Sequence, residues 1–274
     1  MLELRNATCR AGGRLGGRAL VRRLSAGFAP GTVNVVIGPN GAGKTTMLRL
    51  LSGERAADEG KVLLDGVAVQ RLGARALATR RAVLAQFTPE GFSYTAHEVV
   101  RLGSEAPTAG RAVPPWTGPE SALAAVDLEG FGGRLVTELS GGEVQRVHLA
   151  RVLCQLGSAT GPEGARYLLL DEPIASLDIR HQVLVMEIAR AFARAGGCVV
   201  VILHDLNIAA RYADRLVLME EGEISASGSA GEILTADRLT RAYGLPLTVR
   251  VVTGEGDNGA GGDRRVILPA LCAS

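Results

Sequence analysis

The sequence lacks any long uninterrupted run of apolar residues. No stretch approaches the roughly 18 apolar residues that a membrane-spanning helix needs. The first residues, Met1 to Arg5, also lack the apolar core of a signal peptide. We therefore expect any role at a membrane to depend on a partner protein.

An excess of charge of one sign is absent as well. The 274 residues include 30 Lys and Arg against 28 Asp and Glu, which gives a net charge of +2 at pH 7. This near-balance provides no basic surface for nucleic acid, so we expect no nucleic-acid partner. Apolar residues make up 47% of the chain, which predicts a packed globular fold rather than disorder.

Paired cysteines are also missing. The four cysteines form no Cys-x-x-Cys pair, and no histidine lies at ligand spacing from any of them, which argues against a zinc site. We expect reduced thiols, as in a cytosolic protein. The cysteines are Cys9, Cys154, Cys198 and Cys272.

Short apolar runs alternate with helical patterns along the chain. Three of them, Val33–Ile37, Tyr167–Leu170 and Val199–Leu203, are almost continuously apolar. Such runs are typical of parallel strands that are covered on both faces. The alternation predicts an α/β fold with a parallel sheet. Met1 to Ala7, and again Val33 to Ile37, also fit an added antiparallel layer.

The middle of the chain differs from its two ends. From about Thr88 to Leu156 the pattern is helical, apart from a loop rich in proline and glycine from Ala106 to Glu120. We expect Trp116 in that loop to pack locally rather than to contact a partner. A second loop is predicted from Gly157 to Ala165, and a mobile glycine-rich segment from Gly254 to Asp263.

Residues 38–45 carry the pattern GxxxxGK[ST] of a phosphate-binding loop. Its glycines let several backbone N–H groups converge on phosphate oxygens. A helix predicted from about Lys44 to Leu51 directs its positive end to the same place. We expect Lys44 to reach the outer phosphates of ATP and the Thr45 hydroxyl to hold Mg²⁺. The predicted phosphate-binding residues are Gly38, Pro39, Asn40, Gly41, Ala42, Gly43, Lys44, Thr45 and Thr46.

Two acidic residues, Asp171 and Glu172, end the apolar run that starts at Tyr167. Ligands of such sheets meet the carboxyl ends of the parallel strands. We expect Asp171 to hold Mg²⁺ through water, and Glu172 to orient and polarise the water that attacks ATP.

Leu139-Ser140-Gly141-Gly142-Glu143, followed by Val144-Gln145-Arg146, resembles the signature motif of ABC ATPases. Together with the phosphate-binding loop, it identifies the chain as similar to this family over about residues 1–250. The family's other motifs occur in the family's order. They are Gln86 for the Q-loop, Asp171-Glu172-Pro173 for the second nucleotide motif, Ser176-Leu177-Asp178 for the D-loop and His204 for the switch histidine.

The resemblance implies a P-loop NTPase (RecA-like) core with a mixed sheet, an antiparallel β layer and an inserted helical subdomain. The core would occupy about residues 1–87 and 165–235, the helical subdomain about 88–160, and a C-terminal tail 251–274. It also implies a homodimer that binds two polytopic permease subunits and works indirectly with a periplasmic substrate-binding protein. The chain would be peripheral, at the cytoplasmic face of the inner membrane.

In this family two domains face each other head to tail, and each ATP lies between one phosphate-binding loop and the partner's signature motif. Ser140, Gly141 and Gly142 would then contact the γ-phosphate bound to the other chain. The resemblance implies a catalytic set of Glu172, His204, Gln86 and Lys44, and a Mg²⁺ set of Thr45, Gln86 and Asp171.

The sequence departs from the family at the residue that usually stacks on adenine. No aromatic residue precedes Phe28, and Cys9 or a neighbouring residue takes that position. Either the stacking is weak or the planar guanidinium of Arg10 replaces it. Ile174, where threonine is common, is expected to pack.

The subfamily that the chain resembles is that of the haem importer ATPases, through residues 146–153, 155–166 and 177–182. This implies that the chain powers transport of haem (hemin) across the cytoplasmic membrane. Importers of ferric siderophores or cobalamin stay open as alternatives, although their ATPases tend to have a tight loop where this chain has a long one before the strand that starts at Tyr167. A non-transport ABC ATPase is a further alternative.

Overall fold

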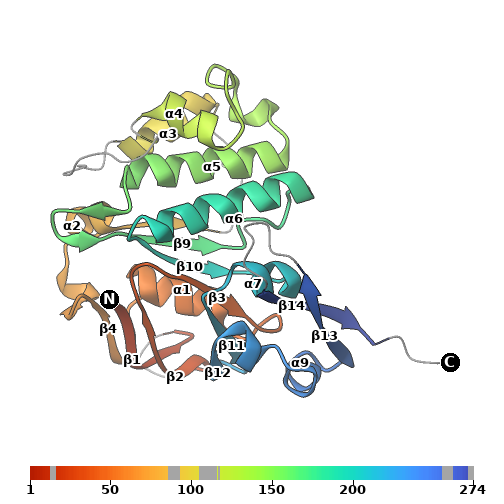
Figure 1. Cartoon of the computed structure of the whole chain (residues 1–274). Coiled ribbons are helices and arrows are strands. Elements are labelled where there is room, and N and C mark those ends of the chain that lie inside the picture. The colour runs from red at the N-terminus through yellow and green to blue at the C-terminus, as the bar shows by residue number, and fades with distance from the viewer. Residues whose placement is uncertain (13–16, 86–92, 105–115, 117, 255–261, 271–274) are drawn as a thin grey trace.

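A six-stranded sheet forms the centre of the computed structural model (Figure 1), which describes residues 1–12, 17–85, 93–104, 116, 118–254 and 262–270. The strand order is β12-β11-β3-β10-β9-β6. β11 and β12 pair antiparallel, and the other neighbours pair in parallel. The strands are β3 (Val33–Ile37), β6 (Arg81–Leu84), β9 (Tyr167–Asp171), β10 (Cys198–Ile202), β11 (Arg215–Glu220) and β12 (Glu223–Gly228).

Alternate residues of these strands face two separate hydrophobic cores. In β3, Val35 and Ile37 belong to one core and Val36 to the other. β10 divides in the same way, with Val201 in the first core and Val200 in the second. Because both faces of the sheet are covered, its central strands are apolar at nearly every position, as their sequences predict.

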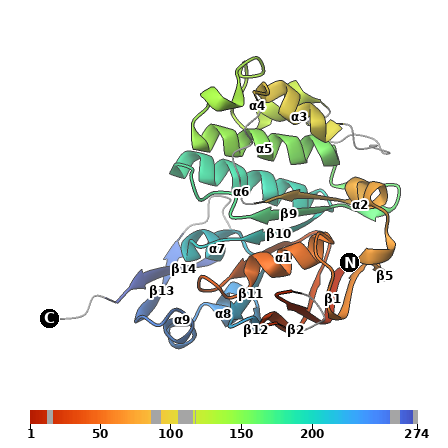
Figure 2. The same ribbon diagram turned by 180° about the vertical axis from the view of Figure 1, so that it is seen from behind.

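A smaller antiparallel sheet and helix α1 (Lys44–Ser52) cover one face. In Figures 1 and 2, α1 lies between the two sheets. The interpretation of Val33–Ile37 as part of the antiparallel layer is wrong: β3 lies between β10 and β11 in the central sheet, because all five of its residues are buried. The smaller sheet has the order β2-β1-β4-β5, with β1 (Leu2–Arg10), β2 (Ala19–Phe28), β4 (Glu59–Leu64) and β5 (Val67–Ala68).

Helices cover the opposite face in layers, with α6 (Ile179–Arg194) next to the sheet and α5 (Gly141–Leu156) beyond it (Figure 1). α3 (Ala96–Ser104) and α4 (Pro119–Ala125) pack against α5. α3 approaches α5 closely at Gly103, where an added Cβ would lie 2.2 Å from the Arg151 carbonyl oxygen. α2 (Ala74–Arg80) lies at the β6 edge of the sheet.

The structure changes two predictions about loops in detail and confirms a third. Pro119 is the first residue of α4 rather than part of a loop, since proline fits the first helical turn. Trp116 is only 4% exposed and stacks on Phe192 of α6 with ring centroids 6.3 Å apart, which confirms local packing. The predicted loop at 157–165 contains a short hairpin of β7 (Thr160–Gly161) and β8 (Gly164–Ala165).

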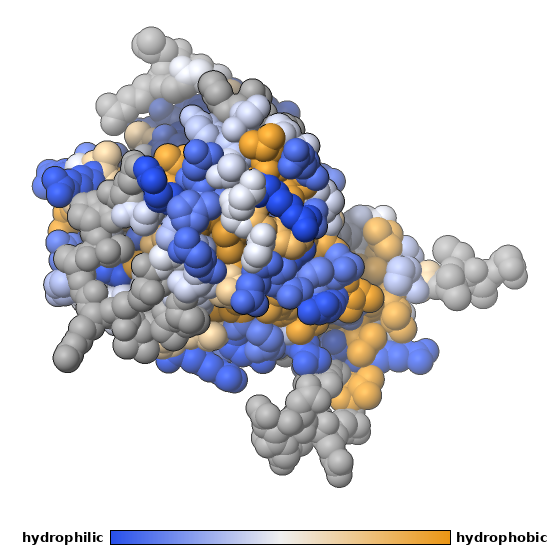
Figure 3. Space-filling view, turned by 90° about the horizontal axis from the view of Figure 1, so that it is seen from above, coloured by the Kyte–Doolittle hydropathy of each residue, from blue (hydrophilic) through white to orange (hydrophobic). Residues whose placement is uncertain are grey.

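The C-terminal part adds helices α7 (Leu206–Tyr212), α8 (Ala230–Ile233) and α9 (Ala236–Tyr243), followed by a hairpin of β13 (Leu247–Gly254) and β14 (Gly262–Pro269). This hairpin pairs across the predicted boundary at residue 250, and most of the predicted mobile segment, 255–261, lies outside the described residues. Apolar residues are exposed on the surface of the hairpin where it projects from the rest of the molecule (Figure 3). Within the described part of the chain, every helix is too short or too polar to cross a bilayer.

We expect Trp116→Ala to destabilise the fold, because it removes a buried ring that packs on Phe192 of α6. Truncating a buried tryptophan costs about 3–5 kcal/mol through lost burial and the cavity left behind. Urea unfolding followed by circular dichroism measures the loss, since Trp116 is the chain's only tryptophan and its removal abolishes that fluorescence signal. Trp116→Phe should recover most of the stability. A loss below about 1 kcal/mol for the alanine variant would contradict the packing argument.

Candidate active site

The phosphate-binding loop turns sharply between β3 and α1, and two of its glycines are required by geometry. Gly38 has φ +144°, and an added Cβ would lie 2.1 Å from the Met219 carbonyl oxygen. Gly43 has φ +95°, and its Cβ would lie 2.6 Å from Val21. The loop can therefore follow this path only with glycine at both positions.

Lys44 begins α1, and its side chain folds back into the loop. It is 6% exposed, and Nζ donates hydrogen bonds to the carbonyl oxygens of Gly38 at 2.8 Å and Pro39 at 2.9 Å. Burial lowers the pKa of Lys44, while the carboxylates of Glu172 and Asp171 act to raise it. The loop thus holds a positive charge at the carboxyl end of β3.

Asp171 ends β9 beside the phosphate-binding loop. Its carboxyl group is buried, and the Thr45 hydroxyl donates to Oδ1 over a long 3.4 Å. Burial raises the pKa of the Asp171 carboxyl, and the bond from Thr45 opposes that rise. These two groups are hard oxygen donors of the kind that Mg²⁺ prefers.

Glu172 turns away from the end of β9 through a left-handed backbone conformation, with φ +51°. A residue other than glycine rarely adopts this conformation, and such strain concentrates at functional sites. The turn brings Glu172 Oε1 within 2.6 Å of His204 Nε2, and the Glu172 side chain stays 19% exposed. His204 itself follows β10, the neighbouring parallel strand.

A pocket of about 290 Å³ lies at the phosphate-binding loop, lined by Glu172 and bordered by Asp171 and His204 through their contacts with Thr45 and Glu172. Leu20, residues 40–46 and Glu172 line it. No signature residue is among the described residues that line this pocket. The structure therefore brings the phosphate-binding loop together with the acidic residues of the same chain, and it leaves the signature elsewhere.

The signature residues begin helix α5. Ser140 is the N-cap: its hydroxyl oxygen accepts from Glu143 N, and Glu143 Oε2 in turn accepts from Ser140 N at 2.7 Å. Ser140 and Gly141 are exposed, whereas Gly142 packs on the D-loop, where an added Cβ would lie 3.1 Å from the Ser176 carbonyl oxygen. The start of α5 thus presents a hydroxyl and exposed backbone to the outside of the molecule.

Two glutamines that the sequence analysis did not assign to the site connect these motifs. Gln145 Nε2, on α5, donates to the Glu172 carbonyl oxygen at 3.0 Å. Gln182 Nε2, on α6, donates to the Leu177 carbonyl oxygen at 3.0 Å. Gln145 follows the signature directly, and this proximity was the only signal available in the sequence.

Two sequence predictions near the site have different outcomes. Gln86 lies outside the described residues. Of the positions predicted beside adenine, Cys9 itself is excluded, because it is 0% exposed and belongs to the core beneath the antiparallel sheet. The neighbouring Arg10, whose Nη2 donates to Glu59 at 3.1 Å, stays a prediction for that role. Leu20, from the next strand, lines the pocket.

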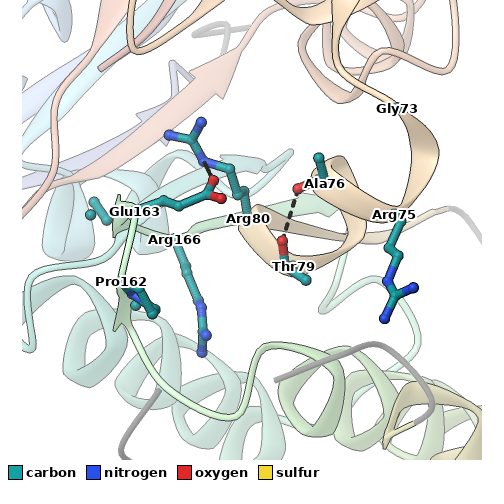
Figure 4. Close-up of a pocket in the computed structure, with 11 residues that line it drawn as sticks. Gly73, Arg75, Ala76, Thr79, Arg80, Pro162, Glu163 and Arg166 are labelled. Atoms are coloured by element: carbon teal, nitrogen blue, oxygen red, sulfur yellow. Dashed lines mark hydrogen bonds and ion pairs between the residues drawn. The ribbon is translucent and has the colours of Figure 1, made fainter. Parts of the chain in front are cut away.

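A larger pocket, of about 510 Å³, lies between α2 and the β7–β8 hairpin (Figure 4). Both of these elements lead into the first residues of β6 and β9, so this pocket lies at the amino ends of the strands, opposite the phosphate-binding loop. Two of the three arginines that line it contact protein groups: Arg80 pairs with Asp65 and Glu163, and Arg166 donates to the carbonyl oxygen of Leu156.

Comparisons with known proteins agree with this geometry. Residues 21–175, more than half of the chain, match the ABC transporter family. The Hemin import ATP-binding protein HmuV of Rhizobium meliloti (strain 1021) is 45% identical over 243 residues, which cover 87% of this chain and 90% of that protein. The protein of the same name from Mesorhizobium japonicum is 46% identical over 240 residues, with the same coverage of 87% and 90%.

Solved structures share the fold. An ABC transporter in an inward-facing conformation matches with a TM-score of 0.74 and 23% identity, over 97% of both chains. A dimeric ATP-binding cassette bound to ADP and Pi matches with a TM-score of 0.70 and 25% identity, over 84% of this chain and 99% of that chain. From the family match and the identity to its relatives, the chain belongs to the ABC transporter family.

Proposed function

We propose that the chain is the ATP-hydrolysing subunit of an importer that carries haem across the cytoplasmic membrane. The observation that carries the ATPase activity is the convergence of Lys44, Asp171 and the Glu172–His204 pair around one pocket. The cargo is proposed from the relatives named as hemin import ATP-binding proteins, at 45% and 46% identity.

Binding of ATP would use groups that already face the pocket. The backbone N–H groups of residues 40–46 and the positive end of α1 attract the phosphates. Lys44 Nζ has three N–H donors and uses two of them on carbonyl oxygens, so the third would bind a phosphate oxygen, which gives the buried ammonium a negatively charged partner. Leu20 offers an aliphatic surface at the same pocket.

Hydrolysis would depend on Glu172 and His204. The Glu172 carboxylate orients the attacking water and accepts a hydrogen bond from it, which raises the electron density on the water oxygen. His204 Nε2 lies 2.6 Å from Glu172 Oε1. Its single N–H would donate either to that carboxylate or to the γ-phosphate of bound ATP. Thr45, Asp171 and Gln86 would hold Mg²⁺, which neutralises charge on the phosphates.

The complete site would require a second copy of the chain. Ser140, Gly141 and Gly142 are absent from the described lining of the pocket, and Ser140 and Gly141 are exposed at the start of a helix whose positive end suits an anion. We propose a head-to-tail homodimer in which they contact the partner's γ-phosphate. Two permease subunits would bind this dimer at the cytoplasmic face of the membrane, and a periplasmic binding protein would deliver the cargo.

Reconstitution tests the cargo. The chain and its permease subunits would be placed in proteoliposomes with a binding protein loaded with haem, a ferric siderophore or cobalamin. Haem import that requires ATP, with no transport of the other two cargoes, supports the proposal. Transport of only the siderophore or cobalamin would assign the chain to one of those importers, and ATPase activity without any transport would leave only the ATPase assignment.

We expect Glu172→Gln to bind ATP and to lose nearly all steady-state hydrolysis. The amide keeps the shape of the side chain but is a far weaker acceptor for the attacking water. Phosphate release measures turnover, and a fluorescent nucleotide measures binding. Glu129→Gln, the same change at an exposed turn, should hydrolyse ATP like the unchanged chain. Near-normal hydrolysis by Glu172→Gln would remove Glu172 from its proposed role.

We expect Lys44→Ala to weaken nucleotide binding about 10-fold or more, since hydrogen bonds to charged groups contribute about 1.5–3 kcal/mol. Titration with a fluorescent nucleotide measures the dissociation constant. Lys61, the only other lysine in the sequence, is exposed on β4, and Lys61→Ala provides the matched control with unchanged affinity. Equal affinities for the two variants would place Lys44 outside the site.

The dimer proposal predicts complementation between two inactive chains. Ser140→Arg blocks the partner's γ-phosphate position, and Lys44→Ala damages the chain's own loop. In a mixed dimer one site carries both changes and the other carries neither. Each homodimer has two damaged sites, so only the mixture keeps an intact one.

Nucleotide trapping by the reconstituted complex provides the measurement. One trapped ATP per mixed dimer is expected, together with whatever hydrolysis a single intact site permits. Two or no trapped nucleotides in the mixed dimer would speak against the shared site.

A further inference from the structure

The C-terminal segment, defined here as residues 236–270 within the described structure, contacts the phosphate-binding loop. The backbone N–H of Gly38 donates a 3.1 Å hydrogen bond to the hydroxyl oxygen of Tyr243, the last residue of α9. Burial raises the pKa of Tyr243 to about 12, so the phenol stays neutral at working pH. The two residues are 205 positions apart in the chain.

This bond holds the loop at the point where it leaves β3. The Gly38 carbonyl oxygen, on the other side of the same residue, accepts from Lys44 Nζ at 2.8 Å. Gly38 therefore links the two side chains: its N–H is bound by Tyr243, and its carbonyl oxygen accepts from Lys44. A shift of Gly38 would move the ammonium that we propose for phosphate binding.

The same segment also contacts the helix that follows His204. Asn207, on α7, pairs with Ile267 of β14 through two hydrogen bonds: Ile267 N donates to Asn207 Oδ1 at 2.8 Å, and Asn207 Nδ2 donates to the Ile267 carbonyl oxygen at 3.3 Å. The Asn207 side-chain amide thus binds both the N–H and the C=O of Ile267, as the backbone of a neighbouring strand would. Figures 1 and 2 both place α7 beside β14.

The start of α7 is fixed by these bonds together with its own cap. Asp205 Oδ1 accepts from Asn207 N at 2.7 Å and from Ile208 N at 2.9 Å. His204 directly precedes this cap, and its imidazole lies 2.6 Å from Glu172. β14 therefore restrains the start of α7, and a shift of β14 would displace the backbone next to His204.

The two contacts belong to one connected unit. Leu247 N, at the start of β13, donates to Thr240 Oγ1 of α9 at 2.9 Å. β13 then pairs with β14, with Val249 opposite Ile267. Leu239 and Ile267 are buried in the main core. An unbroken series of contacts thus runs from the phosphate-binding loop, through α9 and the hairpin, to α7.

We propose that the C-terminal segment braces the nucleotide site, and that Tyr243 and Asn207 are positioning residues, Tyr243 for Lys44 and Asn207 for His204. The proposal rests on the ATPase function proposed above and adds two residues to its machinery. Because each residue acts on a different side chain, their removal should change different kinetic constants.

Two conservative variants test the brace in the full chain with its permease subunits. Tyr243→Phe keeps the ring and removes the acceptor for Gly38 N–H; we expect fluorescent nucleotide to bind about fivefold more weakly, with kcat nearly unchanged. Asn207→Leu keeps the size and removes both bonds to Ile267; we expect kcat to fall about fivefold, with nucleotide affinity nearly unchanged.

Tyr167→Phe is the matched control, since the Tyr167 hydroxyl also makes a 3.1 Å hydrogen bond, to Asp65, at the amino end of β9 and so at the opposite end of the strands from the nucleotide site. It should leave both constants unchanged. Urea unfolding of every variant separates positioning from a general loss of stability. The brace is overturned if both variants match the unchanged chain, or if both lose affinity and kcat together in proportion to stability. Failure of the ATPase proposal looks different, because the unchanged chain would then not hydrolyse ATP.

Discussion

The buried ammonium of Lys44 is the constraint on which the rest of the site depends. A charge on a residue that is only 6% exposed is stable only with close polar partners, because transfer of an unpaired charge out of water is very costly. The glycine turn supplies two carbonyl oxygens, and the neighbouring strand end supplies two carboxylates. An arriving polyphosphate offers the same ammonium a stronger partner, so the arrangement that keeps Lys44 stable also prepares it for ATP.

Parallel strand order converts this local arrangement into a catalytic one. β3, β10 and β9 are neighbours and point the same way, so the loop after β3, His204 after β10 and Glu172 after β9 emerge at one edge of the sheet. The left-handed turn at Glu172 then directs its carboxylate toward the pocket. Gln145, on the signature helix α5, donates a hydrogen bond to the Glu172 carbonyl oxygen. A movement of α5 would therefore shift the backbone of Glu172.

The C-terminal segment gives the carboxyl ends of these strands a second support. Tyr243 of α9 bonds to the first residue of the phosphate-binding loop, and β14 of the hairpin bonds to the helix after His204. These two targets lie at the ends of adjacent strands. Each bond alone is modest, since a typical hydrogen bond contributes about 0.5–1.5 kcal/mol. Their importance lies in position, because a small backbone displacement at Gly38 or α7 moves a group that must meet the phosphates accurately.

Much of the site could be predicted from the sequence because its information is local. The spacing of glycines before Lys44 fixes the loop, and a short apolar run before Asp171 places two acids at a strand end. The capping contacts between Ser140 and Glu143 at the start of α5 are equally local, and the apolar runs predict the central strands. These features depend on backbone conformation over a few residues, which the sequence of those residues determines.

Only the tertiary structure decided which strand faces which core and which distant groups meet. It placed β3 in the centre of the main sheet, turned Cys9 inward and buried Trp116 against Phe192. It also joined Tyr243 to a glycine 205 residues away. A single tyrosine hydroxyl leaves no periodicity or motif in the sequence, because its partner is chosen by the packing of whole elements rather than by its neighbours in the chain.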